Sequence, residues 1–148
     1  MNWWQERLKI KKWLNGRSFE RQKGDRAPTL ILFYSPKCHG CLFTAFPLLL
    51  ELYRQVDPDK LRFLAIQIHE VPDQFFNERF DLTRVEFPVG LDDELQTYRL
   101  FDCSGTPHWF LVDAEGRILH SIFGSDRGSL AKLSYALMEV LGIPVELE

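Results

Sequence analysis

The stretch Thr29-Leu30-Ile31-Leu32-Phe33-Tyr34-Ser35-Pro36-Lys37-Cys38-His39-Gly40-Cys41 joins a continuous apolar run to a Cys-x-x-Cys motif. The run 29–34 is typical of a strand buried on both faces. After a short turn, apolar periodicity over 42–56 predicts a helix. Cys38 would then lie beside the first turn of that helix, where unpaired N–H groups and the helix dipole favour a thiolate. Because the thiolate attacks disulfides, the stretch predicts a redox dithiol in which Cys38 attacks and Cys41 resolves the mixed disulfide.

Two other uses of the motif are less favoured. A structural zinc site needs four ligands, and the other candidates do not form a second closely spaced pair. These candidates are Cys103, His69, His108 and His120. An inert disulfide within one helical turn would close almost no loop and stabilise little. We therefore expect no metal and no cofactor beyond the redox-active Cys38–Cys41 disulfide. Cys103 is expected to be a small buried side chain that packs in the core, rather than a third redox thiol.

The composition fits one compact domain over residues 1–148. The chain is 45% hydrophobic and carries a formal charge of −3, which suits a sizeable core. Residues 1–26 form a basic extension with eight Lys or Arg and three acidic residues, so the remaining residues are acidic. A basic arm could touch a membrane or nucleic acid. Its charges are interleaved with Trp and Leu, which favours a solvated face, and the acidic body argues against nucleic acid as a partner.

The sequence gives no sign of export or membrane insertion. No segment approaches the ~20 apolar residues of a membrane span. Residues 1–7 already include charged side chains, so the apolar core of a signal peptide does not form there. The expected location is cytoplasmic as the chain is written, with a periplasmic location as the alternative if a leader was removed. Membrane contact through Trp3 and Trp4, near the lysines of the arm, is a less favoured alternative.

The N-terminal segment is interpreted as a β-hairpin over residues 8–20. Leu8-Lys9-Ile10-Lys11 alternates between apolar and charged, and Asn15-Gly16 is typical of a two-residue type I′ turn. A helix over residues 3–14 would scatter its apolar side chains over two sides.

The rest of the chain has the pattern of a parallel α/β sheet. A helix over 40–56 should be kinked by Pro47. A tight turn at Ala114-Glu115-Gly116 indicates a hairpin between two apolar runs. The further elements expected are strands at 61–68 and 87–91, helices at about 72–80 and 93–101, the hairpin strands 109–113 and 117–123, and a helix over 128–141.

Three stretches resemble the thioredoxin-like superfamily, in particular the TlpA/ResA-like thiol–disulfide oxidoreductases. Residues 33–41 are similar to the family's strand and Cys-x-x-Cys. Residues 87–107 are similar to the insertion that separates this branch from plain thioredoxins, and Gly105-Thr106-Pro107 with residues 108–118 is similar to the cis-proline loop and its hairpin. The resemblance spans about residues 8–142. It implies a central mixed β-sheet flanked by helices, with the N-terminal hairpin and the helix/strand insertion before the cis-Pro strand.

The resemblance also implies the function and the substrate contacts. Pro107 would be cis and pack against the dithiol, and the backbone of Thr106 would pair with the extended chain of a substrate. The implied partners are protein thiols and disulfides and an upstream reductase. Two carboxylates common in relatives are absent, since Leu32 and Thr44 stand in their places. Proton transfer at Cys41 must therefore use water, His39 or a distant acid.

Lys37 and His39 flank the nucleophile, and a cation at either position would stabilise its thiolate. The alternatives to an oxidoreductase are a peroxiredoxin-like peroxidase and a non-catalytic interaction module. The peroxidase is less favoured because Ser35 stands where a Thr-x-x-Cys pocket would have its threonine. The interaction module would use Trp3, Trp4 and the basic arm.

Overall fold

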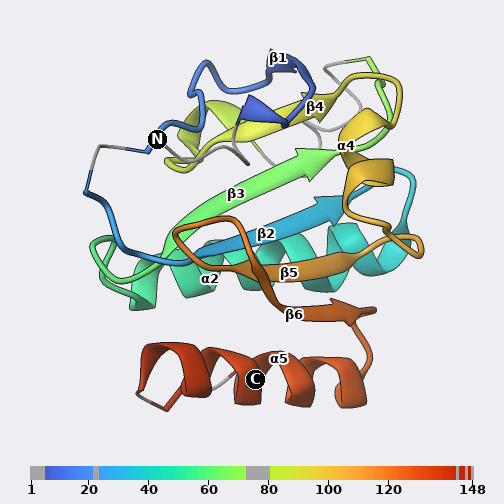
Figure 1. Cartoon of the computed structure of the whole chain (residues 1–148). Coiled ribbons are helices and arrows are strands. Elements are labelled where there is room, and N and C mark those ends of the chain that lie inside the picture. The colour runs from blue at the N-terminus through green and yellow to red at the C-terminus, as the bar shows by residue number, and fades with distance from the viewer. Residues whose placement is uncertain (1–5, 22–23, 73–80, 143, 146, 148) are drawn as a thin grey trace.

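The computed structural model of the chain describes residues 6–21, 24–72, 81–142, 144–145 and 147. A six-stranded sheet with the order β1-β4-β3-β2-β5-β6 forms its centre (Figure 1). The strands are β1 (Ile10–Trp13), β2 (Thr29–Tyr34), β3 (Arg62–Gln67), β4 (Val89–Asp92), β5 (His108–Val112) and β6 (Ile118–Phe123). The helices are η1 (Cys41–Ala45), α2 (Phe46–Gln55), η2 (Leu82–Arg84), α4 (Gln96–Leu100) and α5 (Arg127–Leu141).

The sheet is mixed, as the resemblance to the thioredoxin-like superfamily implied. β2 pairs in parallel with β3, and β3 pairs in parallel with β4. β2 also pairs antiparallel with β5, and β5 pairs antiparallel with β6. The β2 strand therefore has a hydrogen-bonded partner on each side, and all six of its residues are buried. This central position explains its continuous apolar sequence.

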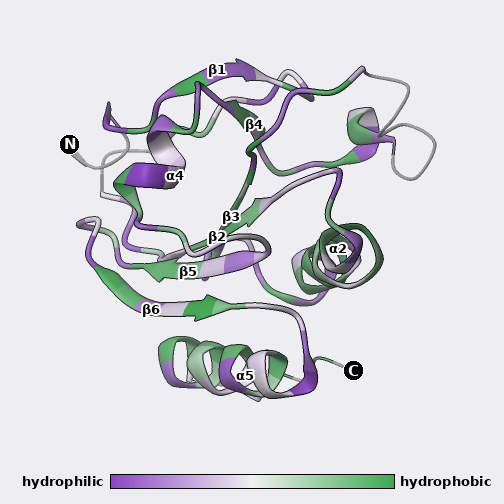
Figure 2. Cartoon of the chain, turned by 90° about the vertical axis from the view of Figure 1, so that its right-hand side faces the viewer, coloured by the Kyte–Doolittle hydropathy of each residue, from purple (hydrophilic) through white to green (hydrophobic). Residues whose placement is uncertain are grey.

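The two faces of the sheet carry separate clusters of buried side chains. Leu30, Leu32 and Tyr34 of β2 pack on the face covered by α2 and α5. Ile31 and Phe33 point to the other face and pack with aromatic side chains from the α4 region. Figure 2 shows α2 and α4 on opposite sides of the strands. Among the described residues, no helix is both long and apolar enough to cross a bilayer.

The predicted hairpin over residues 8–20 is wrong. β1 pairs antiparallel with β4 instead, and residues 17–20 form no strand. The Asn15 side chain explains the difference, because its amide donates to the carbonyls of Val85 and Phe87 at 2.9 and 2.8 Å. Its oxygen also accepts the Val89 N–H at 3.2 Å. Asn15 thus fastens the turn to β4, and the following chain leads away rather than back along β1.

Pro47 changes the helix at its start. It has no N–H, so the regular i→i−4 ladder is interrupted there. The chain forms a π-helical turn over Cys41–Ala45, in which the Phe46 N–H donates to the Cys41 carbonyl, before α2 begins. Cys41 is therefore the first residue of a widened turn.

The segment before β5 differs from expectation in part. The helix predicted over 93–101 is confirmed only for Gln96–Leu100, because Glu94 and Leu95 have positive φ angles. The buried Asp92 carboxylate accepts the N–H groups of Thr97 and Tyr98 at 2.9 and 2.8 Å and holds the start of α4. The helix predicted at about 72–80 lies almost wholly outside the described residues, as do Trp3 and Trp4.

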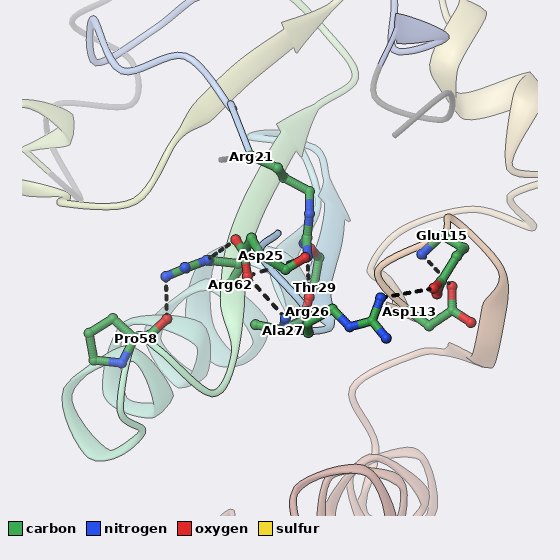
Figure 3. Close-up of polar contacts among 9 residues, drawn as sticks. All are labelled: Arg21, Asp25, Arg26, Ala27, Thr29, Pro58, Arg62, Asp113 and Glu115. Atoms are coloured by element: carbon green, nitrogen blue, oxygen red, sulfur yellow. Dashed lines mark hydrogen bonds and ion pairs between the residues drawn. The ribbon is translucent and has the colours of Figure 1, made fainter. Parts of the chain in front are cut away.

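A buried ion network attaches the N-terminal arm to the sheet (Figure 3). The side chains of Arg21 and Asp25 are 1% and 6% exposed, with a nitrogen–oxygen distance of 3.6 Å. Asp25 also accepts from Arg62 Nε of β3 at 2.8 Å. Arg21 donates to the Thr29 hydroxyl at the start of β2. Burial raises the pKa of Asp25, but the hydrogen bonds from Arg62 and Ala27 and the charge of Arg21 outweigh it and lower the pKa below its usual 3.8.

Replacing Asp25 should destabilise the fold because it leaves Arg21 buried without its carboxylate. We expect Asp25→Ala to lower the free energy of unfolding by about 3 kcal/mol. The control is Glu115→Ala, which removes exposed ion pairs with Arg26 at 3.9 Å and Arg117 at 3.8 Å and should cost less than about 1 kcal/mol. Urea denaturation measures both. Equal losses would contradict the role given to the buried network.

Candidate active site

The pairing of β2 with β5 brings the dithiol and the proline loop together. Phe33 lies opposite His108, so the loop before β5 faces the turn after β2. The Thr106–Pro107 peptide bond is cis. The Cys38 S–H donates to the Thr106 carbonyl at 3.5 Å. Sequence positions 38 and 106 are therefore neighbours in space.

The two cysteines differ in exposure. Cys38 is partly exposed, whereas Cys41 is fully buried at 0% exposure. The Cys41 N–H donates to Cys38 Sγ at 3.3 Å, and the Leu42 N–H donates to the Cys38 carbonyl at 3.1 Å. Cys38 Sγ thus receives a backbone donor at the start of the helical segment, where negative charge on sulfur is favoured.

Burial, followed by the hydrogen bond with Cys38, raises the pKa of Cys41 to about 12. Hydrogen bonds from the Ser35 backbone and the Thr106 hydroxyl act in the opposite direction. Cys41 is therefore a thiol at neutral pH. The arrangement presents one accessible sulfur and keeps a protonated one directly behind it.

The turn between β2 and Cys38 is held by Ser35. Its hydroxyl accepts the Lys37 N–H at 3.1 Å and lies 3.2 Å from Nδ1 of His69. Its carbonyl accepts the Cys38 N–H at 3.0 Å. These bonds close the turn and point the chain into η1.

Gly40 allows the dithiol to approach the chain after β6. A Cβ at this position would lie 2.7 Å from the Ser125 hydroxyl and 3.9 Å from Cδ of Pro107. The first distance is shorter than a Cβ contact allows, so any larger residue would require the Ser125 side chain to move. Sequence reasoning did not find Ser125, since nothing near residue 125 points to the dithiol.

Lys37 and His39 are both exposed. The His39 ring stacks on Phe43, with ring centroids 4.3 Å apart and an interplanar angle of 24°. Among the described contacts, neither side chain touches Cys38 Sγ. Their effect on the Cys38 thiolate therefore stays a prediction.

Leu32 and Thr44 stand at the two positions near Cys41 where relatives often have a carboxylate. Leu32 is buried in the core, and Thr44 lies on η1. Tyr34 is a buried polar residue close to Cys41, and its hydroxyl donates to Gln67 at 2.9 Å. Burial, and then the neighbouring Cys41, raise the pKa of Tyr34 well above its usual value. Tyr34 is therefore a neutral neighbour, and Gln67 was not found from the sequence.

Cys103 lies apart from the dithiol. It packs with the cluster on the opposite face of the sheet from Cys41. Burial, followed by the charges of Asp92 and Asp102, raises its pKa to about 12. All three cysteines are free thiols. Among the described residues, His, Cys, Asp and Glu form no group of three or more able to hold a metal ion.

Comparison with known proteins finds thiol–disulfide oxidoreductases and other thioredoxin-like proteins. No protein-family model matches the chain. It is 28% identical over 114 residues to the thiol–disulfide oxidoreductase YkuV of Bacillus subtilis (strain 168), which covers 74% of this chain and 76% of YkuV. A solved thioredoxin-like protein in the oxidised form matches with a TM-score of 0.71 and 25% identity over 91% of each chain. A thiol–disulfide isomerase from Corynebacterium glutamicum matches with a TM-score of 0.68 and 21% identity over 92% of this chain and 94% of that one.

Alkylation should distinguish the three cysteines. We expect iodoacetamide at pH 7 to modify Cys38 at least roughly tenfold faster than the others, because Cys38 is accessible and the buried thiols stay protonated. Peptide mass mapping of timed samples gives the three rates. In urea the differences should disappear, which provides the control. Modification of Cys41 or Cys103 at the rate of Cys38 would contradict the assignment.

Proposed function

We propose that this member of the thioredoxin-like superfamily, a thiol–disulfide oxidoreductase, acts on protein disulfides with Cys38 as nucleophile and Cys41 as resolving thiol. The observation that carries the proposal is the position of Cys38 Sγ. It is partly exposed, 3.3 Å from the Cys41 N–H and 3.5 Å from the Thr106 carbonyl. An attacking sulfur needs this combination of access and a nearby second thiol.

The reaction has two exchange steps. The Cys38 thiolate attacks one sulfur of the substrate disulfide, and the other substrate sulfur leaves as a thiolate that takes up a proton. Cys41 then loses its proton and attacks Cys38 Sγ, which releases the second substrate sulfur as a thiol. Two electrons pass to the substrate, and Cys38 and Cys41 form a disulfide. An upstream dithiol reductase must return two electrons before the next cycle.

The first step itself prepares Cys41 for the second. Besides burial, both its hydrogen bond with Cys38 and the charge of Cys38 raise the pKa of Cys41. A mixed disulfide at Cys38 removes that charge, since the sulfur is then bonded to substrate. The donors from Ser35 and Thr106 remain and favour the Cys41 thiolate. This order of events partly replaces the missing carboxylates, and water or His39 can carry the proton away.

The surroundings of the dithiol suit an extended protein chain. We assign the backbone of Thr106 and the packing of Pro107 to substrate binding, because they lie beside Cys38 and backbone pairing accepts many sequences. Two aromatic side chains are each 50% exposed here, Phe43 next to the His39 ring and Phe123 next to Gly105. They offer apolar contacts to a substrate chain.

The direction of net electron flow depends on the compartment. The cytoplasmic location predicted from the sequence implies reduction of substrates and an upstream reductase. The periplasmic alternative would need a dedicated reductant in an oxidising environment. Membrane contact through the N-terminal arm would involve Trp3 and Trp4, which lie outside the described part of the chain, and the nearby lysines Lys9, Lys11 and Lys12.

Insulin reduction in the presence of dithiothreitol tests the proposed function. The wild-type chain should accelerate it, and Cys38→Ser should abolish the acceleration, because the attacking sulfur is lost. Cys41→Ser should retain the attack and accumulate a mixed disulfide with substrate at Cys38, visible by mass spectrometry. Cys103→Ser is the matched control and should behave like the wild type. Full activity of Cys38→Ser, or a mixed disulfide at Cys103, would contradict the proposal.

A further inference from the structure

We propose that His108 is a positioning residue for the exchange reaction, whose neutral imidazole holds residues 104–106 so that the Thr106 carbonyl stays beside Cys38. The inference rests on the proposed function, which supplies the reaction that this geometry serves. It gives a role to the first residue of β5, a buried histidine that the exchange chemistry itself does not use.

Both ring nitrogens of His108 have partners. The ring is 3% exposed. Its Nδ1 accepts the backbone N–H of Ser104 at 3.1 Å, and its Nε2 lies 2.8 Å from the Ser121 hydroxyl of β6. Because Nδ1 accepts, the proton of the neutral ring is on Nε2, which donates to Ser121. The contacts therefore select one tautomer.

Aromatic neighbours fix the plane of the ring. Phe110, two residues along β5, stacks on it with centroids 4.4 Å apart and an interplanar angle of 14°. Phe123 of β6 meets it edge-on at 5.7 Å and 68°. A ring held in this way presents Nδ1 to Ser104 in a defined direction.

Residues 104–106, which His108 holds in place, include the Thr106 carbonyl that contacts Cys38. The Ser104 N–H donates a hydrogen bond to His108, and the Pro107 carbonyl accepts one from the Gly124 N–H at 2.8 Å. Between these two points the Thr106 carbonyl accepts from Cys38 at 3.5 Å. Gly105 has a φ of +144°, and a Cβ there would lie 3.0 Å from the Phe123 ring. The loop therefore depends on hydrogen bonds at its ends rather than on packing of a side chain at Gly105.

The hydrogen bond from Ser104 requires a neutral His108 ring, because a proton on Nδ1 would remove the acceptor for the Ser104 N–H. Burial lowers the pKa of His108 below its usual 6.5, and Asp102 in the preceding loop partly offsets this. Asp102 is the charged group that acts on the ring. The neighbours on β5 and β6 are uncharged: Phe110, Ser121 and Phe123.

Two substitutions separate the two hydrogen bonds. In His108→Asn the side-chain oxygen can take the place of Nδ1 and accept from Ser104, while the bond to Ser121 is lost. In His108→Gln the amide reaches toward Ser121 but cannot accept from Ser104. Both replace the ring with a smaller amide, so they share the loss of aromatic packing. Ser121→Ala removes the Nε2 partner alone.

The readouts are kcat and KM for insulin reduction by the full chain and amide hydrogen exchange of Ser104 by NMR. We expect His108→Gln to lower kcat/KM and Ser104 protection roughly tenfold, and His108→Asn and Ser121→Ala to stay within about threefold of the wild type. In the wild type, Ser104 protection should also fall as the pH drops below 6.5 toward the lowered pKa of His108. In His108→Asn this pH dependence should be absent.

Equal losses in the Asn and Gln variants would overturn the proposal, because they would show that the ring only fills space. Unchanged Ser104 protection in His108→Gln would also overturn it. A wild-type chain that fails to reduce insulin would instead contradict the proposed function. The exchange data on Ser104 remain interpretable in that case, so the two failures are distinguishable.

Discussion

The antiparallel pairing of β2 with β5 is the constraint on which the rest of the site depends. It places Phe33 opposite His108, so the turn that carries Cys38 and the loop that carries Thr106 meet at one end of the sheet. A slip of one residue would exchange the faces of Leu32 and Phe33, which pack in different clusters. The large buried side chains of both strands therefore fix this register. Contacts between distant segments, such as Cys38 with Thr106, follow from it.

The same pairing gives the two sulfurs their different environments. Cys38 lies at the end of the turn, where it is partly exposed to solvent and contacts the Thr106 carbonyl. Cys41 begins the π-helical turn and points into the core beside Tyr34, where burial keeps it protonated. The widened turn exists because Pro47 has no N–H to continue the regular ladder. Thus a proline six residues after Cys41 helps to set the geometry of the resolving thiol.

Local pattern predicted much of the fold and of the site. The apolar run of β2, the tight turn between β5 and β6 and the spacing of Cys38 and Cys41 are signals carried by neighbouring residues. The N-terminal segment was mispredicted because Asn15 bonds to residues about 70 positions away rather than closing a local hairpin. The contacts of Gly40 with Ser125 and of His108 with Ser121 were missed for a similar reason. Each depends on a side chain or backbone brought close only by the sheet.

If Cys38 and Cys41 form one reversible redox couple, an equilibrium redox titration of the protein should show a single transition. The full chain is equilibrated with glutathione mixtures of increasing oxidised fraction, quenched in acid and mapped by peptide mass spectrometry. We expect one two-electron transition, about 30 mV for each tenfold change in the equilibrium, with a disulfide between Cys38 and Cys41 and with Cys103 still a free thiol. A chain that forms no Cys38–Cys41 disulfide, or that pairs either cysteine with Cys103 instead, would contradict it.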